Sequence, residues 1–392
     1  MFYITLIIGL IFSFTFKDQI KATKIYTALL LILSAFRYGI GADYFSYMFL
    51  YKRLFVNVVP ELKFGRQKQE AGFRALGSLI KTLGANYQVY LAILALISLY
   101  FVYKISIKYS KNPMLSMTTY YAFYYFVWTL SSLRQGLAMA VGMYFLLEAI
   151  NNKRWVAFLV VSVLMYFVHT SSLILLVMYL LAKYIPWNKK RMIIAITASV
   201  IIAFIPMGDM VLYFSQYVDV LRRIASYLDG VFTIEKLLSL SSLARLVLMG
   251  VVLYYYNELV EDSPMMKNIV HVYLISFIVY FLFQFSEITA ARLSIYGRIL
   301  DFVILPSIIY LKAPKINKNI VIAGLVLFIC MYFAKELNTM QNQAGLVTKE
   351  NYYVSYSSIF NKEDRNYNTF YYEVLFFKGG TDGFPKNFHM IQ

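Results

Sequence analysis

Apolar segments of helical length follow one another along almost the whole chain, and short charged loops separate them. Of the 392 residues, 60% are hydrophobic and 15% are charged, whereas a soluble protein has about 25% charged residues. This pattern predicts an all-α integral membrane protein rather than a soluble domain with a single anchor.

Helical length and the charged breaks between apolar runs predict about 12 transmembrane helices. They are expected at residues 2–16, 25–36, 88–103, 114–130, 135–150, 155–169, 171–186, 192–206, 241–256, 269–285, 294–311 and 319–334.

The short loops differ sharply in their basic residues. The loops at 17–24, 104–111, 153–154, 183–191, 267 and 312–318 hold sixteen Lys and Arg residues, whereas those near 131–135, 170 and 286–298 hold three. Because cytoplasmic loops carry the excess of Lys and Arg, the first set is predicted to be cytoplasmic and both termini external. The loop at 257–268 fits least well, since it has one Lys against three acidic residues.

Three longer segments fall on the predicted external side. Residues 37–87 and 207–240 form external loops, and an amphipathic helix is expected in the second through Leu221, Ile224 and Leu228. Residues 1–334 are therefore taken as the membrane domain. The polar tail at 335–392 is either a small lid over the outer surface or a disordered end.

The net charge of +17 does not indicate nucleic-acid binding, because the charge lies in short clusters between apolar spans. The single cysteine, Cys330, excludes an intramolecular disulfide and a cysteine-based metal cluster.

Unusual polar residues gather at the outer ends of the predicted spans. Arg37, Asp43, Tyr44 and Tyr47 follow the second span, where two glycines allow a tight turn. They are either an interfacial anchor or part of a binding site. Glu70 precedes an apolar helical run, so it is either a general base or a helix N-terminal charge.

Two predicted hairpins carry further candidates. Arg134 and Gln135 lie at the outer turn of a hairpin with no spare loop, where a charge is costly and often functional. The planar guanidinium of Arg134 suits bidentate phosphate binding. His169, at the next tight hairpin, is a base, a phosphate-binding donor or a buried structural residue.

Arg292 and Tyr296 are four residues apart and share a helix face, and Arg245 lies near the outer end of the ninth span. The excess of arginine around one surface favours an anionic ligand such as a lipid-linked pyrophosphate. No metal-binding or nucleotide-binding motif is present, so no metal and no cofactor are expected.

The order and spacing of these residues resemble the EpsG-type family of Wzy-like O-antigen, capsule and exopolysaccharide polymerases, over roughly residues 30–310. The elements that carry the resemblance are Arg37-x-Gly-x-Gly-x-Asp43-Tyr44-x-x-Tyr47, Glu70-x-Gly72-Phe73, Arg134-Gln135-x-x-Ala138, His169-x-Ser171 and Arg292-x-x-x-Tyr296.

The resemblance implies a glycosyltransferase of the bacterial cytoplasmic membrane with its active face external or periplasmic. It would transfer a growing glycan from one undecaprenyl pyrophosphate carrier to a lipid-linked repeat unit. Membrane lipids, a chain-length regulator and a flippase would be its partners. The roles we expect are pyrophosphate binding by Arg37, Arg134 and Arg292, proton acceptance by Glu70, Asp43 or His169, and sugar contacts by Tyr44, Tyr47 and Tyr296.

Other functions stay open at this point. A lipid-linked oligosaccharide flippase would need polar residues near the bilayer midplane and repeat symmetry. An O-antigen ligase would use the same donor with another acceptor, and a membrane O-acyltransferase would pair a histidine with another catalytic residue.

Overall fold

The computed structural model describes residues 1–205, 207–217, 225, 233–237, 240–311, 316–344 and 350–361. This part of the chain is helical, and its one β-type pairing is the antiparallel bridge between Arg37 and Ser358. The expected all-α class is therefore confirmed. The predicted amphipathic helix through Leu221, Ile224 and Leu228 lies outside the described residues.

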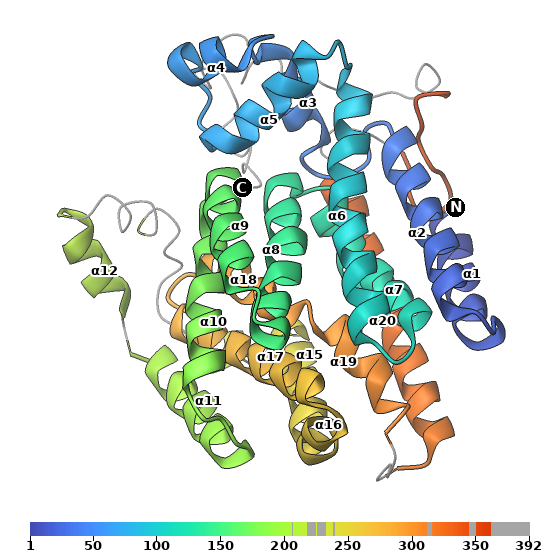
Figure 1. Cartoon of the computed structure of the whole chain (residues 1–392), viewed down its shortest axis with the longest axis vertical. Helices are drawn as coiled ribbons and strands as arrows, with labels where there is room; N and C mark the ends of the chain where they lie inside the picture. The colour runs from blue at the N-terminus through green and yellow to red at the C-terminus, as the bar shows by residue number, and fades with distance from the viewer. Residues whose placement is uncertain are drawn as a thin grey trace.

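The first half of the chain forms helices that are mostly antiparallel neighbours in the bundle (Figure 1). They are α1 (Phe2–Thr15), α2 (Gln19–Phe36), α3 (Tyr44–Arg53), α4 (Val58–Phe64), α5 (Ala71–Thr82), α6 (Tyr87–Tyr109), α7 (Pro113–Tyr120), the π-helix η1 (Tyr121–Thr129), α8 (Leu133–Asn152), α9 (Trp155–Val168), the short 3-10 helix η2 (Thr170–Leu173) and α10 (Ile174–Tyr184).

The second half adds helices that pack against α7, α8 and α10. They are α11 (Lys189–Ala203), α12 (Met207–Ser215), α14 (Ile234–Leu237), α15 (Leu240–Tyr254), α16 (Tyr256–Asp262), α17 (Pro264–Leu282), α18 (Glu287–Arg298), α19 (Asp301–Ile308) and α20 (Lys318–Ala344).

Among the described residues, five helices are long and apolar enough to cross a membrane: α2, α6, α8, α17 and α20. The number is up to seven if the pairs α11–α12, bent by 71°, and α15–α16, bent by 61°, each form one span. Helices occupy all twelve predicted segments, but several are short or bent. The chain is thus a multi-pass membrane protein, while twelve spans and two external termini stay predictions.

Two predicted boundaries need correction. The expected continuous span at 294–311 is two helices, because α18 ends at Arg298 and α19 starts at Asp301. The predicted external loop at 37–87 contains α3, α4 and α5, whose apolar side chains pack into a second hydrophobic core around Tyr51, Phe73 and Tyr90. Burial of these aromatic rings offsets the entropy lost when the segment becomes ordered.

Side chains that accept hydrogen bonds from backbone N–H groups fix where many of these helices begin. Asn86 caps α6 through Val89 N, and Asn112 caps α7 through Leu115 N. Ser263 and Ser286 cap α17 and α18 in the same way. These short polar side chains satisfy donors that the first helical turn leaves free.

The loops predicted to be cytoplasmic meet at one end of the bundle. Lys111 forms an ion pair with Asp262, and Asn268 donates a hydrogen bond to Asn151 at 2.9 Å. The acidic segment 257–268, which contains most of α16 and the start of α17, therefore lies beside a basic loop. This arrangement agrees with the predicted grouping of the loops, although which end is cytoplasmic stays a prediction.

The opposite end carries the layer formed by α3, α4 and α5, which lies across the ends of α6 and α9 (Figure 1). Residues 350–361 also pack at this end. Tyr352 is 1% exposed and donates a hydrogen bond to the carbonyl of Gly39, and Tyr38 N donates to the carbonyl of Ser357 at 2.9 Å. This part of the predicted tail therefore lies on the turn that follows α2, and α20 itself continues to Ala344, beyond the predicted limit at residue 334.

Candidate functional site

The carboxylate of Glu70 joins three segments at the end of the bundle that carries α3, α4 and α5. Its Oε1 lies 3.1 Å from Nδ1 of His169 and accepts a hydrogen bond from the backbone N–H of Thr170 at 3.3 Å. Its Oε2 accepts a hydrogen bond from Nη1 of Arg134. The side chains of Glu70, His169 and Arg134 are 16%, 14% and 28% exposed, so solvent and ligands reach this cluster.

Glycine brings Glu70 close to His169. Glu70 is the N-cap residue of α5, and Gly72 lies where this helix crosses the end of α9. A Cβ atom on Gly72 would lie 2.8 Å from the carbonyl oxygen of Phe167, so only glycine allows this approach. The sequence Glu70-Ala-Gly72-Phe73 thus provides the carboxylate and the contact that positions it.

Arg134 lies in the first turn of α8. Its Nε donates to the hydroxyl of Tyr47 at 3.5 Å, and Nη1 donates to Glu70. The remaining nitrogen, Nη2, has no hydrogen-bond partner within the described part of the chain. Gly136 allows close packing here, because a Cβ atom would overlap the carbonyl of Trp128. The guanidinium is therefore held by two contacts and keeps one edge for a ligand.

Electrostatic effects differ between the two acidic residues of the site. Burial raises the pKa of Glu70, but the hydrogen bond from His169 and the charge of Arg134 outweigh it and lower the pKa to about 2. For Asp43, burial prevails and raises the pKa, although Arg134 and Arg292 oppose this effect. Glu70 is thus a fixed anion, and Asp43 lies within the electrostatic reach of both arginines.

Two predicted residues support the cluster from neighbouring helices. Gln135 is buried, and its Nε2 donates to the backbone carbonyl of Arg292 at 2.6 Å. The hydroxyl of Tyr296 lies 3.0 Å from that of Ser171. These contacts tie α18 to α8 and η2, so they position Arg292 relative to Arg134 and His169.

Three predicted residues lie elsewhere. Arg37 is 1% exposed and donates to the carbonyls of Ile40 and Leu130, so it stabilises the turn after α2. Tyr44 is equally buried beneath it. Arg245 donates to the hydroxyl of Tyr280 and lies 4.8 Å from the centroid of that ring. The described contacts of these side chains are made within the protein, and their ligand-binding roles stay predictions.

Sequence reasoning missed a buried acid. Asp301 is 2% exposed, accepts a hydrogen bond from the hydroxyl of Tyr124 at 2.6 Å and keeps Oδ1 without a partner. An Asp within the predicted apolar span 294–311 was the available signal, since ionisable residues inside membranes are usually functional. The backbone N–H of Thr170 and the hydroxyl of Ser171 were also missed as contacts, although both follow His169 directly.

The donor set does not resemble a metal site. In the ranges that the structure describes, no three His, Cys, Asp or Glu side chains converge in a way that would hold a metal ion. The polar side chains of the site instead combine the carboxyl groups of Glu70 and Asp43 with His169, Arg134 and Arg292.

Comparison with known families agrees with the motif pattern. The model of the EpsG family matches residues 20–358, which is most of the chain. The protein belongs to the EpsG family. The match extends beyond residue 310, where the motif resemblance ends, and includes the segment at 350–358 that packs on the turn after α2.

Membership of the EpsG family associates the chain with polymerase-type function in exopolysaccharide biosynthesis. No curated protein and no solved structure shows significant similarity to it. The EpsG match covers every residue of the cluster around Glu70.

Proposed function

We propose that the protein is a polysaccharide polymerase acting at the outer face of the bacterial cytoplasmic membrane. It would transfer a growing glycan from one undecaprenyl pyrophosphate to the nonreducing end of a second lipid-linked repeat unit. The contact set that joins Glu70 to His169 and Arg134 supports this proposal most directly, because it combines a proton acceptor with an anion-binding group.

His169 is the general base in this scheme. Glu70 is an anion and can only accept hydrogen bonds, so Nδ1 of His169 carries the proton between them. This leaves the lone pair of Nε2 for the hydroxyl of the attacking sugar. The same pairing of a carboxylate with a histidine orients the base in other enzymes. Of the three predicted bases, Glu70 then becomes the positioning residue.

The proposed reaction is a single displacement. The acceptor hydroxyl oxygen bonds to the anomeric carbon of the growing chain, its proton passes to Nε2 of His169, and the bond from that carbon to the pyrophosphate oxygen breaks. Undecaprenyl pyrophosphate leaves with the electron pair. Nη2 of Arg134, which makes no hydrogen bond within the described part of the chain, would stabilise the charge that develops on the leaving oxygen. The guanidinium of Arg292 would contribute to the same stabilisation.

Transport of a lipid-linked oligosaccharide is the second candidate. Asp301 favours it, because Oδ1 of this carboxyl and Nη1 of Arg298 are buried without hydrogen-bond partners. Polar groups of this kind mark substrate paths in transporters. The cluster at Glu70, however, lies at the end of the helices, where an extracytoplasmic reaction would take place.

Deletion of the gene separates these functions through the surface polysaccharide. A polymerase predicts that the ladder of lengths disappears while single repeat units are still attached. Loss of all attached repeats would instead indicate a ligase or flippase, and an unchanged ladder with altered acetylation would indicate an acyltransferase.

Complementation with site variants then tests the mechanism. His169→Gln should lower the polymerisation rate by about 10² to 10⁴, the usual contribution of a general base. Arg66→Ala is the matched control, because Arg66 is exposed in the same outer layer and should leave the ladder unchanged. A normal ladder with correctly inserted His169→Gln would rule out His169 as the base.

A further inference from the structure

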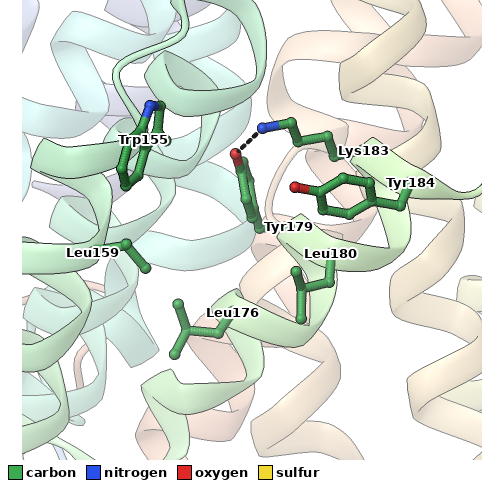
Figure 2. Close-up of a pocket in the computed structure, with 7 residues that line it drawn as sticks. All are labelled: Trp155, Leu159, Leu176, Tyr179, Leu180, Lys183 and Tyr184. Carbon is green, nitrogen blue, oxygen red and sulfur yellow. Dashed lines mark hydrogen bonds between the residues drawn. The ribbon is translucent and has the colours of Figure 1, made fainter.

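A groove lies between α9 and α10 and is lined by residues of these two helices (Figure 2). Its volume of about 520 Å³ is within the range of about 300 to 1,000 Å³ that is typical of ligand sites. Trp155 begins α9 and His169 follows its last residue, so the rise of the helix places the Trp155 end of the groove about 20 Å from His169, and no residue of the Glu70 cluster lines the groove. The groove is therefore a separate feature.

The two parts of the groove differ in chemistry. Leu159, Leu176 and Leu180 line one part, and Leu159 and Leu180 are 43% and 53% exposed. Such exposure on the outside of a membrane bundle places these side chains against lipid chains rather than water. This part of the groove suits an alkyl chain.

Aromatic rings and a cation line the other part. Lys183 Nζ donates to the hydroxyl of Tyr179 at 2.6 Å and lies 5.4 Å from the ring centroid of Tyr184. Figure 2 shows the indole nitrogen of Trp155 near the same end. Lys183 is in none of the ion pairs between described residues, so no carboxylate there neutralises its charge. Two N–H donors thus converge where the groove reaches the basic loops.

The surroundings add positive charge. Lys153 and Arg154 immediately precede Trp155, and Lys189, Lys190 and Arg191 follow Lys183 closely in sequence. Basic residues between helices at the cytoplasmic side of a membrane attract anionic lipid head groups. Arg154 lies 3.8 Å from the carboxylate of Glu148, so the charge that an anionic lipid would balance is mainly that of Lys183 and the neighbouring lysines.

We infer that the groove binds an anionic glycerophospholipid of the cytoplasmic leaflet. Its acyl chain lies along the three leucines, and its phosphate accepts hydrogen bonds from Lys183 and from the indole N–H of Trp155. This inference does not depend on the reaction at Glu70. A nonselective aromatic anchor at the membrane interface is the alternative, and it would show no preference for lipid charge.

The test measures lipid binding to the purified full-length protein by native mass spectrometry. Phosphatidylglycerol and phosphatidylcholine with the same acyl chains are compared. Wild-type protein should retain phosphatidylglycerol preferentially, and Lys183→Gln should weaken this retention about fivefold, as expected for one lysine near an anionic lipid. Lys21→Gln is the matched control, because Lys21 is exposed in another basic loop, at 17–24, and does not line the groove.

A second variant tests the apolar part without changing charge. Leu159→Trp fills the groove at an exposed position and should also reduce the retention of phosphatidylglycerol. Equal binding of both lipids by wild-type protein would overturn the inference. So would equal losses in Lys183→Gln and Lys21→Gln, because general surface charge would then explain the binding.

Discussion

Among single residues, Glu70 shows most clearly how neighbouring side chains determine what a carboxylate can do. A carboxylate with a pKa of about 2 hardly accepts a proton at neutral pH, so it orients His169 rather than replacing it as base. The contacts from Arg134 and His169 that lower the pKa also bring three separate segments together. The acidic residue therefore contributes to stability as well as to the proposed chemistry.

Stability should consequently depend on pH through Glu70. Folding lowers its pKa from 4.5 to about 2, so the stabilisation is fully present above about pH 4.5 and is lost as the pH falls toward 2. Purified wild-type protein should unfold at a higher temperature than Glu70→Gln, and this difference in unfolding temperature should become smaller below pH 4.5. A difference that stays constant across this pH range would contradict the assigned ion pairing.

Arg134 should not be replaceable by lysine. Lysine keeps the charge but loses the planar fork that contacts Glu70 and Tyr47 together, so Arg134→Lys should lower the polymerisation rate about ten- to hundredfold. Membrane insertion should be unaffected. The same change at exposed Arg66 provides the control, and full activity of Arg134→Lys would mean that charge alone is sufficient.

The sequence predicts the residue types of the site better than their roles. Arg134 and His169 were predicted from their positions at tight hairpins, and the structure brings both to Glu70. Arg37 has an equally suggestive position, yet its guanidinium is directed at backbone carbonyls. Spacing along the chain does not reveal whether an arginine at a helix end faces solvent or the protein.

Among helices and loops, the length of an apolar run predicts where a helix lies, but it predicts less well whether that helix is continuous. Each predicted segment contains a helix, but α18 and α19 are separate and the loop at 37–87 is largely helical. The helices α3 to α5 depend on packing against α6, α8 and α9, a tertiary effect that local hydropathy does not measure.

The contact between α5 and α9 can be tested by a single substitution at Gly72. Gly72→Ala would place a methyl group against the backbone of Phe167, which cannot move aside as a side chain can. We expect a loss of about 1–3 kcal/mol in unfolding free energy and reduced polymerisation, since Glu70 shifts away from His169. Gly250→Ala is the control, because its Cβ would meet nothing within 4 Å. Wild-type stability and activity in Gly72→Ala would refute the close approach.

For the whole molecule, sidedness is the property that the proposed function requires. The loops with many basic residues meet at one end, and the cluster around Glu70 lies at the other. Local charge predicted the grouping of loops, whereas the side-chain pairs that join them, such as Lys111 with Asp262, required the structure.

Thiol labelling in intact cells tests this sidedness. In a Cys330→Ser background, which removes the exposed native cysteine, a cysteine at Thr170 should react with an impermeant reagent added outside. A cysteine at Lys190 should react only after lysis. The reverse pattern would invert the orientation and place the cluster around Glu70 in the cytoplasm.

The contact between residues 350–361 and the turn after α2 bears on biosynthesis. Arg37 and Gly39 are synthesised long before their partners Ser358 and Tyr352. The turn is therefore completed only after more than three hundred further residues have been synthesised and the helices between them inserted. A nascent chain should consequently carry an incomplete turn after α2 until residues 350–361 have been synthesised.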